Sequence, residues 1–189
     1  MNSDHSSPIQ KLNIGCGTHI KSGWVNLDIA NLPGVDMVHD IEKLPLPFVD
    51  AQFDEILCEF VLEHINWPPV LKEIHRILAP GGKLHVLVPH FTSKQNFTDP
   101  QHVRLFSIET FDFFIPSTKT YQSHPGYFDF YFTSIPEHRI TFELSSRLFF
   151  FNKFVAKWVN KTKYRQQLYE SLFLSRLFPA ENIIFTIVK

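Results

Sequence analysis

The stretch KLNIGCG, residues 11–17, decides the fold class, because an apolar strand here runs directly into a turn built on Gly15 and Gly17. Glycines in such a turn let the backbone bend sharply and let a ligand approach the main chain without meeting a Cβ atom. A plain tight turn after a strand has the same composition, so the turn alone is a weak signal. A dinucleotide fingerprint would need a third glycine where this chain has Ile20, and a phosphate-binding loop would need Gly-Lys-Ser/Thr. The turn therefore favours a nucleoside ligand without phosphates.

Further strands are predicted in the first ninety residues, at 24–28, 35–40, 53–58 and 83–88. Between the last two, residues 70–78 carry apolar side chains at helical spacing, and the Ala-Pro-Gly-Gly turn that follows ends this helix. Strands that alternate with helices or loops predict an α/β fold with a mostly parallel sheet that is covered on its faces.

The second half of the chain has weaker periodicity. Residues 91–140 are rich in Phe, Pro, His and Thr, as in loops and short helices, although residues 128–132 alternate like an edge strand. Residues 146–178 are predicted to be helical in two pieces. Residues 182–188 are predicted to form a final strand that pairs antiparallel with the sheet.

Two carboxylates end successive predicted strands next to the glycine turn. Asp28 closes the second strand, 11 residues after Gly17, and Asp40 closes the third. A carboxylate at the first place can accept hydrogen bonds from both hydroxyls of a ribose, and one at the second can lie beside an adenine amino group. A solvated turn aspartate is the alternative for each, but their joint placement favours a nucleoside site.

The motifs at residues 12–17, 23–28 and 38–41 resemble the first three motifs of class I S-adenosylmethionine-dependent methyltransferases. The similarity continues in order and spacing to residue 82, and it is strongest to the group with a methyltransferase type 11-like domain. It implies a Rossmann-like class I methyltransferase fold: a mostly parallel central sheet, an antiparallel C-terminal strand and helices on both faces. It also implies S-adenosylmethionine as the cofactor. One departure is that only 10 residues separate Gly17 from Asp28, so the first crossover helix must be short or missing.

The resemblance assigns seven residues to the cofactor site: Gly15, Cys16, Gly17, Asp28, Asp40, Ile41 and Glu59. By the family pattern, the glycine turn approaches the methionine part of the cofactor and Asp28 holds the ribose hydroxyls. The side chain of Asp40 and the backbone of Ile41 flank adenine. Glu59 lies near the methionine moiety or the methyl-transfer face.

Four residues are candidates for the acceptor side. Methyl transfer from a sulfonium is a single in-line displacement, in which alignment of the reactants contributes roughly 7–11 kcal/mol. A general base is needed only when the acceptor is protonated at neutral pH, as a sugar hydroxyl is, and a histidine suits that task. Asp99 and His102 are the first candidates, because residues 98–106 resemble a segment of polysaccharide- and sugar-modifying methyltransferases. His64 and His90 come next, and a hydrogen-bonded structural histidine is the alternative for each.

The expected organisation is a single domain over residues 1–189. Residues 10–90 form its cofactor-binding half, residues 91–181 a lid and acceptor-binding half, and residues 182–188 the final strand. The expected function is S-adenosylmethionine-dependent methyl transfer to a small molecule or a saccharide. A first rival is a non-catalytic module that binds the cofactor or its product.

Charge and composition restrict the partners. The formal net charge is −1, so nucleic-acid binding is not expected. Two cysteines without metal-ligand spacing argue against a disulfide scaffold and against a metal site. A polar start without a signal-peptide pattern indicates a cytoplasmic protein.

Residues 146–178 interleave Phe with seven Lys or Arg. This pattern favours a core-packing helical pair with a cationic face, and a peripheral membrane contact is the second rival.

Overall fold

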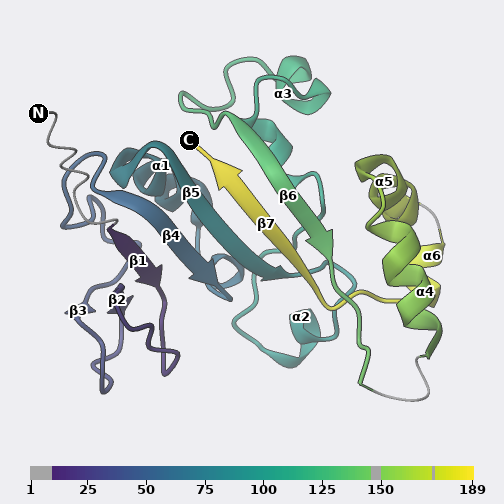
Figure 1. Ribbon diagram of the computed structural model, residues 1–189, viewed down its shortest axis with the longest axis horizontal. Helices are drawn as coiled ribbons and strands as arrows, with labels where there is room; N and C mark the ends of the chain where they lie inside the picture. Colours follow the sequence, from purple (N-terminus) through teal and green to yellow (C-terminus); the bar gives the residue numbers. More distant parts are fainter. Residues whose placement is uncertain (1–9, 146–149, 172) are drawn as a thin grey trace, which may run out of the picture.

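The computed structural model describes residues 10–145, 150–171 and 173–189. Its centre is a seven-stranded sheet in the order β3-β2-β1-β4-β5-β7-β6, seen face-on in Figure 1. Five strands run parallel, and β7 pairs antiparallel with both β5 and β6. The strands are β1 (Lys11–Ile14), β2 (Val25–Asp28), β3 (Met37–Val38), β4 (Phe53–Glu59), β5 (Leu78–Pro89), β6 (Ser134–Ile140) and β7 (Asn182–Val188).

Helices occupy mainly the second half of the described chain. α1 (Trp67–Ile77) joins β4 to β5, and it starts earlier than predicted because Pro68 and Pro69 fit the first turn of a helix, where backbone donors are free anyway. The remaining short and long helices are η1 (Leu62–His64), α2 (Gln95–Thr98), η2 (Thr110–Phe114), α3 (Lys119–Ser123), α4 (Phe150–Val159), α5 (Lys163–Ser171) and α6 (Leu174–Leu177).

The core lies on the face of the sheet that α1 covers. Along β5 the alternate side chains Leu84, Val86 and Val88 are 0–1% exposed, and their neighbours on β4 and β7 are buried with them. Aromatic side chains extend this core beneath β7, where the Trp67 ring lies 5.6 Å from that of Phe111. Phe-rich segments far apart in sequence therefore complete the core of a small α/β domain.

The opposite face of the sheet carries no helix among the described residues. Figure 1 shows β4, β5 and β7 unobstructed, with α1 behind them. The expected helices on both faces are thus found on one face, although the mostly parallel sheet with an antiparallel C-terminal strand is as predicted. The reason is chain length: residues 15–24 and 29–36, which join β1, β2 and β3, are too short for crossover helices. By the right-handed crossover rule, those are the helices that would cover this second face.

Polar side chains lie on the face of the sheet that these missing helices would cover. On the open face, Thr186 donates a hydrogen bond to Glu137 at 3.2 Å, and its Oγ1 lies 3.2 Å from Nδ1 of His85. Lys11 pairs with Glu55 at 2.9 Å on neighbouring strands of the same face. These contacts let the second face of the sheet meet water.

Two predictions for the second half need correction. Residues 128–132 form no strand; Phe130 and Phe132 alternate because they are buried against the ring of Phe114 and its surroundings, not because they pair in a ladder. The helical region 146–178 contains three helices in its described part, and residues 146–149 and 172 lie outside it. The final strand is confirmed with its predicted bounds, Asn182–Val188.

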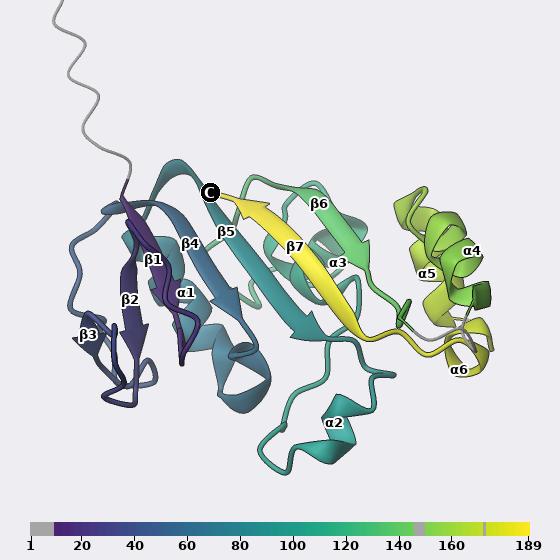
Figure 2. The same ribbon diagram turned by 60° about the horizontal axis from the view of Figure 1, so that its bottom comes forward.

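In Figures 1 and 2, α4 and α5 lie beside the edge strand β6. Within the described chain, no helix is both long and apolar enough to span a bilayer.

Candidate cofactor and acceptor site

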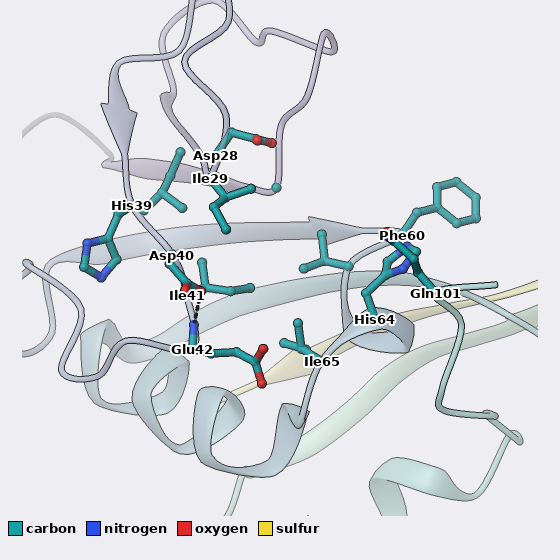
Figure 3. Close-up of a pocket in the computed structure, with 13 residues that line it drawn as sticks. Asp28, Ile29, His39, Asp40, Ile41, Glu42, Phe60, His64, Ile65 and Gln101 are labelled. Atoms are coloured by element: carbon teal, nitrogen blue, oxygen red, sulfur yellow. Dashed lines mark hydrogen bonds between the residues drawn. The ribbon is translucent and has the colours of Figure 1, made fainter. Parts of the chain in front are cut away.

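A pocket of about 360 Å³ lies at the carboxyl ends of β1, β2 and β4. Ligands bind at this edge in open α/β sheets, because the loops after the strands converge there. In Figure 3, Asp40 and Ile41 lie at one end of the pocket, and Phe60, His64 and Gln101 lie at the other. Its lining consists of Gly15, Leu27, Asp28, Ile29, His39, Asp40, Ile41, Glu42, Phe60, Val61, His64, Ile65 and Gln101. A larger pocket of about 520 Å³ beside α2 and α6 lies away from these strand ends.

The glycine turn is held in a conformation that favours glycine. Gly15 has φ +64°, and a Cβ atom there would clash with Cγ2 of Val61. Gly17 has φ +50°, and its N–H donates to Oδ2 of Asp28 at 2.7 Å. This hydrogen bond joins the turn to the end of β2 beside the pocket, which Gly15 lines.

Asp28 and Asp40 lie where the sequence places them. The second Asp28 oxygen, Oδ1, accepts the N–H of Ala30 at 2.8 Å, so backbone donors fix the carboxylate in orientation. Asp40 Oδ1 accepts the N–H of Glu42 at 3.1 Å, and Ile41 beside it is buried. Each carboxylate oxygen retains acceptor capacity for ligand hydroxyl or amino groups.

Three of the seven cofactor candidates are not among the residues that line the pocket. Cys16 is buried, and burial together with the charge of Asp28 raises the pKa of its thiol, so this side chain packs in the core. Gly17 supports Asp28 from outside the lining, and Glu59 is half-buried at the end of β4. Gly15, Asp28, Asp40 and Ile41 are the candidates that the structure brings together around the pocket.

Three of the four acceptor-side candidates also come together. The rings of His64 and His102 meet edge to face with centroids 4.6 Å apart. Oδ2 of Asp99 lies 3.7 Å from Nε2 of His102. The loop that carries them is tied to η1, because the carbonyl of Glu63 accepts the N–H groups of Val103 and Arg104. Burial, together with the neighbouring His64, lowers the pKa of His102.

Glu63 is the residue of this cluster to which sequence reasoning gave no role. Its side chain is 0% exposed, and neither carboxylate oxygen has a hydrogen-bond partner among the described residues. Burial raises the pKa of this carboxyl to about 7. An acidic residue inside the apolar run of residues 60–65 was the available signal, whereas its lack of a partner needed the fold.

His90 lies apart from the other three. It is fully buried, with Nδ1 2.7 Å from Thr92 Oγ1 and Nε2 3.1 Å from Glu170 Oε1. The same Glu170 oxygen accepts the N–H of Ile108 at 2.8 Å. Both ring nitrogens are thus engaged, Nδ1 within the turn that follows β5 and Nε2 with α5, which is the structural alternative for this residue.

Phe60 and Gln101 line the pocket without having been predicted. Phe60 has φ +55°, a conformation that is uncommon outside glycine and costs free energy. It follows β4 and is 40% exposed at the mouth of the pocket. The backbone conformation of Phe60 has no signature in the sequence. Gln101 lies far from the other lining residues in the sequence, and only the folded chain brings it to the pocket.

The fold is that of a class I methyltransferase domain. Residues 12–86 match the family described as "Methyltransferase domain". A crystal structure of an S-adenosylmethionine-dependent methyltransferase from Archaeoglobus fulgidus superposes with a TM-score of 0.59 at 18% identity, over 96% of this chain and 86% of the other. The predicted fold is thus confirmed, and the match over residues 12–86 supports the predicted class I S-adenosylmethionine-dependent methyltransferase family and its cofactor.

Curated relatives share only part of their length with this chain. An uncharacterised protein of Methanocaldococcus jannaschii is 38% identical over 90 residues, 39% of this chain and 40% of the relative. A demethylmenaquinone methyltransferase of Listeria welshimeri is 35% identical over 66 residues, 34% of this chain and 28% of the relative. The chain thus spans less than half the length of either relative.

Proposed function

We propose that this protein transfers a methyl group from S-adenosylmethionine to a hydroxyl group of a small-molecule or saccharide acceptor, within one domain. Residues 10–90 hold the cofactor, and residues 91–181 contribute the acceptor side. The free, buried thiols of Cys16 and Cys58 suit a reducing compartment such as the cytoplasm. No nucleic-acid partner is proposed.

The observation that carries the proposal is the joint placement of Gly15, Asp28 and Asp40 around one pocket. Gly15 contributes main chain to the pocket lining, and an oriented carboxylate stands at each of the next two strand ends. This set suits a nucleoside: Asp28 accepts from the ribose hydroxyls and Asp40 from the adenine amino group. Ile41 offers an apolar surface for the base.

When bound, S-adenosylmethionine would supply a sulfonium methyl group for the acceptor oxygen, with S-adenosylhomocysteine as the leaving product and the hydroxyl proton released to solvent. The protein's contribution is alignment of the acceptor with that methyl group. We assign the alignment to the end of the pocket formed by Phe60, His64 and Gln101, which lies opposite Asp40.

The acceptor side continues into a second, open hollow of about 420 Å³, lined by Gln95, Thr98, Asp99, Pro100 and His102. Its amide, hydroxyl, carboxylate and imidazole groups can hydrogen-bond an acceptor rich in hydroxyls. His64 lines the cofactor pocket and touches His102, which lines this hollow. We therefore place the reacting hydroxyl between these two histidines.

Titration calorimetry with S-adenosylmethionine and S-adenosylhomocysteine tests the cofactor site, with NAD as the control ligand. We expect micromolar binding of both sulfur nucleosides, none of NAD, and at least a tenfold loss in Asp28→Asn, because a hydrogen bond to a charged group contributes about 1.5–3 kcal/mol. Asp129→Asn, at an exposed carboxylate bonded to Lys72, is the matched control. Absence of binding by the wild type would contradict the proposal.

A second candidate function is attachment to an anionic membrane through α4. Phe150, Phe151 and Phe154 are 52–70% exposed, and Lys153 and Lys157 are exposed on the same helix. Such a surface suits the interface of an anionic bilayer. Co-sedimentation with anionic vesicles that is lost in Lys153→Glu/Lys157→Glu would support it, and no co-sedimentation of the wild type would refute it.

A further inference from the structure

Glu63, His64 and His102 form a compact group of metal-binding side chains between the two hollows. One ligand atom from each residue lies within 4.8 Å of the others. η1 carries the first two, and the loop after α2 carries His102. Residues 38 positions apart in the chain are thus brought to one point by the fold.

The group has polar atoms that nothing satisfies within the described chain. Both oxygens of Glu63 and the Nδ1 atoms of His64 and His102 are buried without a hydrogen-bond partner. A buried carboxylate costs several kcal/mol unless it is paired or bound to a metal. The fold therefore holds a buried carboxyl group and two imidazoles together, and no side chain of the described residues hydrogen-bonds to the carboxyl oxygens.

We infer that Glu63, His64 and His102 bind one divalent first-row transition-metal ion, of which zinc is the representative. Two imidazoles and one carboxylate are the ligands that such ions prefer, whereas magnesium and calcium prefer oxygen donors only. Three protein ligands are also typical of sites that keep a coordination position open for water or substrate. The sequence carried no such signal, because its His and Cys residues lack ligand spacing and Glu63 stood in an apolar run.

The location of these three residues suggests what could occupy the open coordination position of the ion. His64 lines the cofactor pocket and His102 lines the acceptor hollow, so a bound ion stands where the two meet. An acceptor hydroxyl that coordinates the ion loses its proton to solvent more readily, because a divalent ion lowers the pKa of a bound oxygen. This part of the inference rests on the proposed methyl transfer, whereas binding of the ion does not.

Calorimetric titration of the metal-free protein with zinc chloride, in a buffer that does not chelate, tests the site. We expect one equivalent to bind to the wild type and to His19→Ala, an exposed histidine outside the group. Glu63→Gln and His102→Gln should each weaken binding at least tenfold. Cobalt(II) serves as a second probe, because its visible absorption reports nitrogen ligation and should disappear in His102→Gln.

Thermal unfolding separates a metal site from a purely structural role. Without metal, Glu63→Gln should unfold at a higher temperature than the wild type, because it removes an uncompensated buried charge. With zinc, the wild type should gain stability and Glu63→Gln should not. If Glu63→Gln does not fold, His102→Gln supplies the same comparison.

Zinc binding that is absent in the wild type, or unchanged in both variants, would overturn the inference. Binding of S-adenosylhomocysteine is measured on the same samples. If it persists where zinc does not bind, the metal site fails and the proposed cofactor site stands. If zinc binds and S-adenosylhomocysteine does not, the metal site stands and the proposed cofactor site fails.

Discussion

Gly15 combines two constraints that can be measured separately. Its φ of +64° disfavours any L side chain, and a Cβ would also clash with Val61. Gly17 shares the positive φ, but a Cβ there would meet nothing within 4 Å. We expect Gly17→Ala to lower the free energy of unfolding by about 1 kcal/mol through backbone strain alone. Gly15→Ala should cost clearly more, about 2–4 kcal/mol, since a steric overlap adds to the strain. Urea unfolding of the two variants checks this, and equal losses would contradict it.

Glu73 offers a pH-dependent test at the scale of one residue. Hydrogen bonds from Arg76, at 2.5 and 3.0 Å, hold the pKa of Glu73 below its ordinary value of 4.5. Because the folded pKa is lower than the unfolded one, the stabilisation is present above pH 4.5 and is lost as the pH falls through the folded pKa. We expect Glu73→Gln to destabilise the protein by about 1–3 kcal/mol at pH 7. The difference from the wild type should shrink below pH 4.5.

The measurement is urea unfolding at pH 7 and at pH 3.5. Asp129→Asn is the comparison, because the exposed pair of Asp129 with Lys72 should contribute little at either pH. A loss in Glu73→Gln that is the same at both pH values would show that its packing, and not its charge, matters.

At the scale of elements, the edge strand β6 is closed by side chains from the segment that follows it. Asn160, just after α4, accepts the N–H of Ile140 at 2.8 Å and donates to its carbonyl at 2.7 Å. Gln166 on α5 donates to the carbonyl of His138 at 2.9 Å. These contacts occupy backbone groups that would otherwise invite pairing with another chain.

We expect Asn160→Ala to lower the free energy of unfolding by about 1–3 kcal/mol, because it leaves two backbone groups of β6 without partners. The variant should also form higher oligomers at high concentration through the exposed edge. Light scattering and denaturant unfolding measure both effects. Asn66→Ala, at an exposed asparagine before α1, is the control. A stable, monomeric Asn160→Ala protein would refute the role of this residue.

The elements differ in how far the sequence predicts them. β1, β4 and β7 follow from apolar runs, and α1 follows from helical spacing bounded by prolines and glycines, because local patterns decide them. The missing helix before β2 also follows, from the shortness of the segment after Gly17. The segment 128–132 could not be predicted, since its Phe residues alternate to fill a core that distant residues create.

The residues of the candidate site likewise differ in whether local sequence patterns predict them. Gly15, Asp28, Asp40 and Ile41 lie at the ends of successive strands that local patterns predict, so their convergence was predictable. The position of His90 and the partnerless state of Glu63 depend on contacts with segments far along the chain, and local patterns carry no record of them.

At the scale of the whole molecule, one layer of helices covers a seven-stranded sheet among the described residues. The proposed cofactor pocket lies toward the edge of the sheet that ends in β2 and β3, where the strands are shortest. β5 and β7 lie inside the sheet with fully buried side chains such as Leu84 and Phe185. At the far edge β3 has two residues, and Val38 is 52% exposed. The loops that line the proposed cofactor pocket are therefore attached to the least buried strands of the fold. Stability is expected to be lowest where the ligand binds.

Hydrogen exchange of the backbone amides tests this uneven distribution. We expect amides of β5 and β7 to exchange only through global unfolding, and those of β2 and β3 through local opening at lower free energy. Saturating S-adenosylhomocysteine should slow exchange across residues 15–42, because a ligand that binds only the closed form penalises its opening. It should leave α4 and α5 unchanged, since they lie beyond β6 at the other edge. Protection by the ligand in α4 or α5 instead would place the nucleoside elsewhere. Uniform protection without ligand would show that the short β2–β3 end is as stable as the buried centre of the sheet.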